Sequence, residues 1–224
     1  MSGRLRSGEG LVEVTFPNTA SCGGQAVAMA DYDGDGLVDV LMSGVDTGSA
    51  NCLLRRTAEG SFERVDTASW LDVAGHPRSY GFAFADYDGD GLVDLFVVYG
   101  ADTTGRTNQL FRQTSGVSYT RVETGDIATD SASSYGAAWG DYNVCLCPQI
   151  SLASFACTDL LSPLAVHCQG DGCLDLVVAN KDEVNFLYRQ DAASDSTCSA
   201  TFTRQTSSVV EAPTWESYNA AWAE

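Results

Sequence analysis

The residues best suited to chemistry are aspartates that recur on alternate positions of a nine-residue run. The run Asp31-Tyr-Asp-Gly-Asp-Gly-Leu-Val-Asp39 is repeated with the same letters from Asp86 to Asp94. Carboxylates at this spacing repel one another unless the chain curls and points them at one centre, where a hard cation cancels the repulsion. Ca²⁺ accepts about six to eight oxygens in loose geometry, whereas Mg²⁺ keeps water and zinc prefers nitrogen and sulfur. The run therefore predicts a calcium-binding loop.

The predicted ligands are the side chains at positions 1, 3, 5 and 9 and the backbone carbonyl at position 7. These are Asp31, Asp33, Asp35, Leu37 and Asp39 in the first copy, and Asp86, Asp88, Asp90, Leu92 and Asp94 in the second. An EF-hand would need a glutamate at position 12, where Met42 and Val97 stand. It would also need a helix after the loop, whereas strand-forming residues follow. A plain polar turn fits one copy, but two intact copies argue against it.

A third copy is interrupted. It runs as far as Asn143 and resumes with Gly170, and removing residues 144–169 restores the motif DYNGDGCLD. Its predicted ligands are Asp141, Asn143, Asp171, Cys173 (by its carbonyl) and Asp175.

The intervening segment of 26 residues differs from its surroundings, with four cysteines, one charged residue and no glycine. Two interpretations stay open. The segment is either a retained in-frame intron or a surface insertion closed by its own disulfides. Peptide mapping of the native protein separates them, because an intron predicts that no peptide from 144–169 appears at full abundance.

The elements that must position these loops also repeat. The first acids, Asp31, Asp86 and Asp141, lie 55 residues apart. An Asn-x-Leu-x-Arg stretch follows each loop, starting at Asn51, Asn108 and Asn185, and a fourth strand-like stretch follows that. Each unit reads as four short strands rich in β-branched and aromatic residues, with no sustained helical period. Four strands per unit in tandem predict an all-β fold built of β-propeller blades, with an open β-solenoid or separate small sheets as the alternative.

These motifs resemble the FG-GAP/VCBS repeat, whose pattern is Phe-x-x-Ala-Asp-x-Asp-x-Asp-Gly-x-x-Asp followed by Asn-x-Leu-Tyr/Phe-Arg. That repeat builds the propellers of integrin α-subunits and of secreted proteins similar to cartilage acidic protein. The resemblance covers nearly the whole chain outside 144–169. It implies one Ca²⁺ in the first hairpin of each blade, an extracellular setting, and a role in adhesion or surface assembly.

The chain holds too few repeats for a whole propeller and is interpreted as an incomplete propeller or fragment. The expected division is a last strand of a preceding blade (9–20), blade 1 (21–75), blade 2 (76–130), blade 3 with its insertion (131–213), and the start of a further blade (214–224). Aromatic residues recur at equivalent places in the blades and are predicted to pack between them rather than to bind sugar: Tyr32, Tyr87, Trp139, Tyr142 and Trp222.

Four cysteines lie outside the insertion. Tracing antiparallel strands puts Cys22 and Cys52 at the same end of blade 1, and Cys173 and Cys198 together at the opposite end of blade 3. Both pairs are predicted to be disulfides, with free buried thiols as the alternative. Disulfides indicate an oxidising compartment, although the first residues show no signal peptide.

The composition of the chain argues against some classes of partner. The chain has 30 acidic and 12 basic residues, a net charge of −18. This balance argues against nucleic acid and anionic lipid as partners. No apolar run is long enough to span a membrane.

The two histidines, His76 and His167, have no evident partner for catalysis. The sequence therefore predicts a non-enzymatic, calcium-binding extracellular segment. Its expected partners are a surface protein, a glycan, or further copies of the chain in an assembly. The alternative is an accessory propeller of a secreted lipase or polysaccharide lyase whose catalytic domain lies outside this chain.

Overall fold

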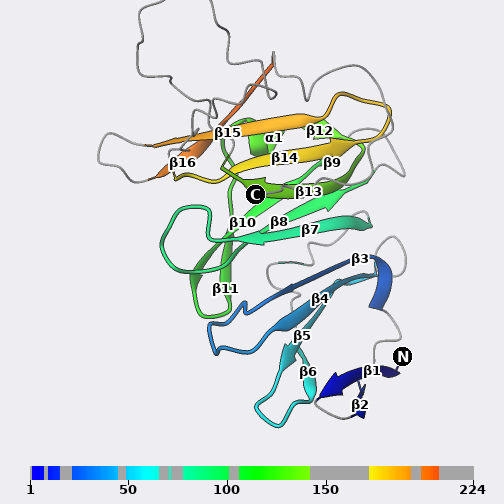
Figure 1. Ribbon diagram of the computed structural model, residues 1–224. Helices are drawn as coiled ribbons and strands as arrows, with labels where there is room; N and C mark the ends of the chain where they lie inside the picture. Colours follow the sequence, from blue (N-terminus) through cyan, green and yellow to red (C-terminus); the bar gives the residue numbers. More distant parts are fainter. Residues whose placement is uncertain are drawn as a thin grey trace, which may run out of the picture.

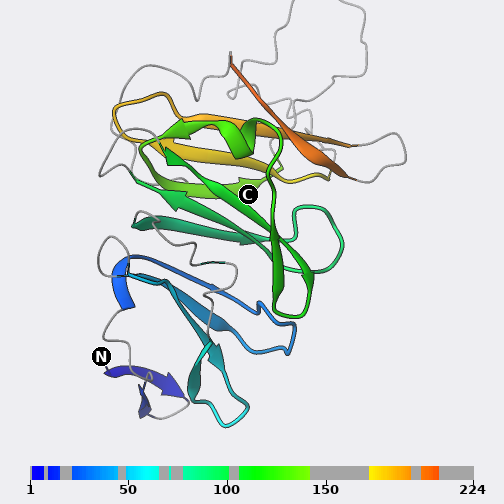
Figure 2. The same cartoon turned by 180° about the vertical axis from the view of Figure 1, so that it is seen from behind.

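Antiparallel β-strands supply nearly all of the regular secondary structure that the computed structural model describes. It describes residues 2–7, 10–15, 22–44, 49–65, 71, 78–100, 106–141, 172–192 and 198–206. In this part of the chain three sheets have four strands each, and within each sheet the strands lie side by side in chain order. Figures 1 and 2 show these sheets following one another as an open stack, from the blue N-terminal sheet to the yellow and orange one.

Each predicted blade contains one of these sheets. The first consists of β3 (Cys22–Ala30), β4 (Asp39–Gly44), β5 (Cys52–Arg56) and β6 (Phe62–Val65). The second consists of β7 (Ser79–Ala85), β8 (Asp94–Tyr99), β10 (Gln109–Ser115) and β11 (Ser118–Arg121). The third consists of β13 (Ser134–Gly140), β14 (Asp175–Asn180), β15 (Phe186–Ala192) and β16 (Cys198–Arg204). The first strands lie side by side, since β7 contacts both β3 and β13. The fold is thus an incomplete β-propeller, as the repeats predict.

Several small elements were not expected from the sequence. Strand β2 (Gly10–Thr15) lies in the range 9–20 expected for the last strand of a preceding blade, and it pairs antiparallel with an additional strand, β1 (Ser2–Ser7). A short ladder joins β9 (Arg106–Thr107) to β12 (Ser131–Ala132), and a four-residue helix, α1 (Asp126–Thr129), precedes β12. Residues 207–224, including the expected start of a further blade, and the insertion 144–169 lie outside the described residues.

Strand β8 of the second sheet is buried on both faces, which explains its unbroken apolar run from Leu95 to Tyr99. Every residue of β8 is buried. Because successive side chains of a strand point to opposite faces, Leu95, Val97 and Tyr99 belong to a cluster shared with the first sheet. Phe96 and Val98 belong to a second cluster, shared with the third sheet. One strand therefore supplies the core of two sheet interfaces.

Aromatic residues close the interface between the second and third sheets. The ring of Trp139 stacks on that of Tyr87, with centroids 6.0 Å apart and planes 8° from parallel. Its indole Nε1–H donates to the carbonyl oxygen of Ala83 at 3.2 Å. Tyr32 lies in the cluster between the first two sheets. The predicted packing role is thus confirmed for these three aromatic residues, while Tyr142 and Trp222 are outside the described residues.

The asparagine that opens each Asn-x-Leu-x-Arg stretch ties the second strand to the third. The side-chain Oδ1 of Asn51, Asn108 and Asn185 accepts the backbone N–H of Gly44, Tyr99 and Asn180, at 3.4, 2.9 and 2.8 Å. Asn108 also donates through Nδ2 to Ser134 Oγ of the next sheet at 2.8 Å. The repetition of this asparagine is explained by a structural hydrogen bond that sequence reasoning did not assign.

Replacing Trp139 by alanine should lower the free energy of unfolding by about 3 kcal/mol, because it removes a large ring from a sheet interface. Met29 occupies the equivalent place in the first sheet but is 64% exposed. The matched control Met29→Ala should therefore change stability by less than about 0.5 kcal/mol. Urea unfolding of both variants measures the difference, and equal losses would contradict the assigned interface.

Candidate metal centre

The acidic runs are the loops between the first and second strands of the first two sheets. Ala30 pairs with Asp39, and Ala85 pairs with Asp94, so the final aspartate of each run starts the second strand. The glycines at the sixth position, Gly36 and Gly91, have φ of 86° and 85°. This left-handed backbone conformation, which glycine adopts without strain, turns the loop back on itself.

The structure brings three carboxylates together in each intact loop. Oxygens of Asp31, Asp33 and Asp39 lie within 4.8 Å of one another, and so do those of Asp86, Asp88 and Asp94. The fifth positions, Asp35 and Asp90, fall outside these groups of three. Each accepts the N–H two residues ahead, that of Leu37 or Leu92, at 2.8 and 2.9 Å. The predicted carbonyl ligands at Leu37 and Leu92 stay predictions.

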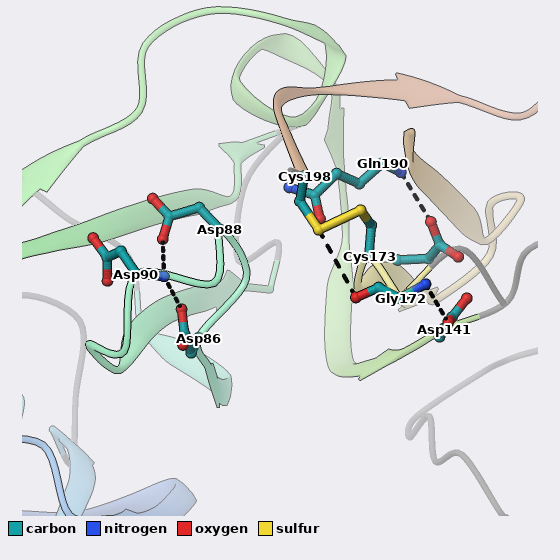
Figure 3. Close-up of a disulfide and its surroundings, with 9 residues drawn as sticks. Asp86, Asp88, Asp90, Asp141, Gly172, Cys173, Gln190 and Cys198 are labelled. Atoms are coloured by element: carbon teal, nitrogen blue, oxygen red, sulfur yellow. Dashed lines mark hydrogen bonds between the residues drawn. A yellow bond between two sulfur atoms is a disulfide. The ribbon is translucent and has the colours of Figure 1, made fainter. Parts of the chain in front are cut away.

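The first aspartate organises the backbone of its loop. Asp86 accepts the N–H of Asp90 on Oδ1 at 3.0 Å and that of Gly91 on Oδ2 at 2.9 Å. Asp31 does the same for Asp35 and Gly36. Figure 3 shows the amide of Asp90 directed at the carboxylates of Asp86 and Asp88. The loop is therefore already curled around its acids by its own amides.

The last aspartate is buried and joins the loop to the third strand. Asp94 is fully buried; its Oδ2 accepts the N–H of Tyr87 at 3.1 Å, and its Oδ1 that of Gln113 at 2.7 Å. Asp39 makes the equivalent bonds with Tyr32 and Arg56, at 3.2 and 2.7 Å. Position 9 thus has a structural role that the sequence did not indicate, besides its predicted role as ligand.

Burial makes these carboxylates costly to ionise. It raises the pKa of Asp94 to about 7, and the negative charges of Asp88 and Asp90 act in the same direction, while the two backbone donors oppose it. Burial also raises the pKa of Asp39. A cation at this point would favour the ionised forms. The electrostatics of the loop therefore suit a bound positive charge.

An arginine from the third strand already supplies part of that charge. Arg55 Nε lies 3.0 Å from Asp33 Oδ2, and its Nη2 lies 3.8 Å from Asp35 Oδ2. Arg112 pairs in the same way with Asp88, and with Asp90 at 2.8 Å. Both arginines belong to the Asn-x-Leu-x-Arg stretch. Their recurrence at one position in each repeat was the signal that could have linked them to the acids.

The interrupted third loop keeps part of the same geometry. The N–H of Gly172 donates to Asp141 Oδ2 at 3.0 Å across the insertion (Figure 3). This bond corresponds to the one from Gly36 to Asp31 in the first loop. Asp175 is fully buried and accepts the N–H of Gln190 at 2.9 Å, like the last aspartates of the other loops. The predicted ligands Asn143 and Asp171 lie outside the described residues.

Both predicted disulfides are present. Cys22, the first residue of β3, is bonded to Cys52, the first residue of β5. Cys173 is bonded to Cys198, which ties the third loop to the start of β16 (Figure 3). The Cα atoms of the two pairs lie 5.8 and 5.4 Å apart. Strand tracing from the sequence was sufficient to pair these cysteines.

Comparison with known families bears on the region of the two intact loops. Residues 31–97 match the family model of the FG-GAP-like repeat. This part of the chain therefore carries an FG-GAP-type repeat. The match begins at the first aspartate of the first loop and ends in β8, so it spans both intact loops and the strands β4 to β7. No curated protein matches the chain. Among the described residues, no helix is long and apolar enough to cross a membrane.

The buried aspartate should matter for stability even without a metal ion. In excess EGTA, Asp94→Ala leaves two buried backbone N–H groups without an acceptor and should cost about 2–4 kcal/mol of unfolding free energy. Asp90→Ala, in the same loop but partly exposed, should cost less than about 1 kcal/mol. Denaturant unfolding in EGTA checks this prediction, and similar losses for the two variants would contradict the structural role of Asp94.

Proposed function

We propose that this chain is a non-enzymatic, calcium-stabilised β-propeller segment of an extracellular protein, used for adhesion, recognition or surface assembly. The observation that carries the proposal is the convergence of three carboxylates at equivalent places in two FG-GAP-type loops.

The donor set of each loop fits calcium. The converging atoms are all carboxylate oxygens, which hard cations prefer. In the second loop, four aspartates and Arg112 leave a local charge of −3, and one Ca²⁺ would reduce it to −1. We infer that Asp86, Asp88 and Asp94 hold the ion in this loop, and Asp31, Asp33 and Asp39 in the first. Bound there, calcium supplies charge neutralisation and fixes the loop.

The setting follows from the cysteines and the charge. Two disulfides support an oxidising compartment outside the cytosol. Extracellular calcium modules bind their ions with dissociation constants of about 10⁻⁴–10⁻³ M, which extracellular calcium can fill. The net charge of −18 disfavours nucleic acid, so we propose a protein or glycan at the cell surface or matrix as the partner, or further copies of the chain.

A catalytic role for the loop acids is disfavoured by their contacts. In the second loop Asp86 and Asp94 each accept two backbone N–H groups, and Asp88 and Asp90 pair with Arg112. These contacts hold the carboxylates in place for a cation. General acid–base work would need a carboxyl facing a substrate proton. We therefore assign the loops a structural role in presenting the propeller surface.

Asp33→Ala and Asp88→Ala should each remove about one bound calcium ion per chain, as counted by isothermal titration calorimetry. Glu123→Ala is the matched control, because Glu123 is an exposed acid outside the loops, and it should leave the stoichiometry unchanged. Unchanged stoichiometry in both loop variants would refute the assigned sites.

Calcium should also stabilise the fold by mass action. At free calcium tenfold above the dissociation constant, each site adds about 1.4 kcal/mol to the unfolding free energy. The melting temperature should therefore fall when EGTA is added to the calcium-loaded protein. A melt that is the same in calcium and in EGTA would count against a stabilising ion.

A further inference from the structure

The side chain of Gln113 on β10 touches both intact acidic loops. Gln113 is 2% exposed. Its Nε2 donates to the carbonyl oxygen of Tyr32 in the first loop at 2.6 Å, and to that of Gly116 in its own sheet. Its Oε1 accepts the N–H of Val93, the eighth residue of the second loop, at 2.7 Å. One amide thus holds main-chain groups of two loops that belong to different sheets.

Gln113 also completes a series of hydrogen bonds from one buried aspartate to the other. Asp39 of the first loop accepts the N–H of Tyr32 at 3.2 Å, and the carbonyl of Tyr32 accepts from Gln113. The backbone N–H of Gln113 in turn donates to Asp94 Oδ1 of the second loop at 2.7 Å. Both ends of the series are proposed ligands of a cation.

Apolar packing holds the same residues in place. The ring of Tyr32 is 1% exposed in the cluster between the first two sheets, which also contains Tyr119. The hydroxyl of Tyr119 donates to the carbonyl oxygen of Val93 at 2.9 Å. Both main-chain groups of Val93 are therefore bonded to side chains at this interface. A packed contact of this kind transmits displacement rather than absorbing it.

We propose that Gln113 is a positioning residue that couples the two calcium loops, so that an ion in one loop raises the affinity of the other. The inference rests on the proposed function. An ion that orders Asp39 and Tyr32 also fixes the amide of Gln113, and with it Val93 and Asp94. Binding of the first ion then accounts for most of the conformational entropy lost when the loops become ordered. The second ion therefore binds more tightly. Coupling of this origin is reciprocal between the two sites.

The residues equivalent to Gln113 in the other two sheets differ from it in burial or in contacts. In the first sheet the equivalent residue is Arg56, which is exposed and donates only its backbone N–H to Asp39 among the contacts described. In the third sheet the equivalent residue is Gln190, which is fully buried and donates its N–H to Asp175. Glutamine therefore stands at this position in the two sheets that follow another four-stranded sheet.

Calcium titration of variants measures the coupling directly. Every protein in this titration carries Asp141→Ala, which removes a predicted ligand of the third loop. The protein with this change alone is called the parent. Adding Asp88→Ala isolates the first loop, and adding Asp33→Ala isolates the second, so each single-loop association constant is measured alone. The overall two-ion constant of the parent, divided by the product of the single-loop constants, gives the coupling factor.

We expect a coupling factor of about five or more in the parent, the lower end of typical allosteric couplings, and a factor near one with Gln113→Leu. The matched control is Gln109→Leu, because Gln109 is a buried glutamine of the same strand whose side chain bonds Tyr99. The control should retain the parent's factor. A coupling factor near one in the parent overturns the inference, and so does a coupling factor that Gln113→Leu leaves unchanged. Neither result contradicts the calcium sites themselves. Absence of any calcium binding overturns both proposals.

A second measurement keeps Gln113 in place and so does not depend on the folding of Gln113→Leu. Hydrogen exchange at the Val93 amide is followed in saturating calcium, with and without Asp33→Ala. We expect this first-loop variant to speed the exchange of Val93 roughly fivefold, in line with the coupling. An unchanged rate at Val93 contradicts transmission between the loops.

Discussion

The structure depends most on the buried aspartate that ends each acidic loop. A carboxylate taken out of water is stable only when donors replace the solvent. Asp39 and Asp94 each find two such donors, one in the loop and one on the third strand. Asp175 keeps the donor from the third strand. Each aspartate thereby locks the first hairpin of its sheet onto the third strand. In the first two sheets this strand also carries the arginine that faces the loop acids.

The interfaces between sheets depend on this attachment of the first hairpin to the third strand. Once the hairpin and third strand are fixed, the alternation of side chains along β8 presents apolar groups on both faces. The tyrosine at the second position of the loop is carried into the interface as well: Tyr32 packs between the first two sheets and Tyr87 against Trp139 of the third. The loops and the sheet interfaces are thus one structure, so a ligand that orders a loop also acts on the packing of neighbouring sheets.

Part of the excess of acidic residues is explained by the loops. The loops gather carboxylates that would repel one another, and the protein offsets that repulsion with loop amides, one arginine per intact loop and, by our proposal, a calcium ion. Burial raises the pKa of Asp94, so the loop is electrostatically strained without a cation. By our proposal, a calcium ion relieves this strain.

The sequence alone determined the features that depend on short spacing. The loops of alternating aspartates, the strands of each repeat and the two cysteine pairs could all be predicted, because turns and antiparallel neighbours are set by residues close in the chain. The roles of the repeated asparagine and arginine could not be read from it, although both recur visibly. Each acts on an atom whose position depends on how the strands pair.

Only the tertiary structure decided what depends on the packing of whole sheets. It directed Asp35 and Asp90 towards arginines rather than into the groups of three. It also divided the side chains of β8 between two cores. The contact of Gln113 with Tyr32 joins residues 81 positions apart, and no local pattern predicts it. Such contacts arise because the packing of neighbouring sheets brings a loop of one sheet against the third strand of the next. That packing depends on all the apolar residues on the facing sides of the two sheets.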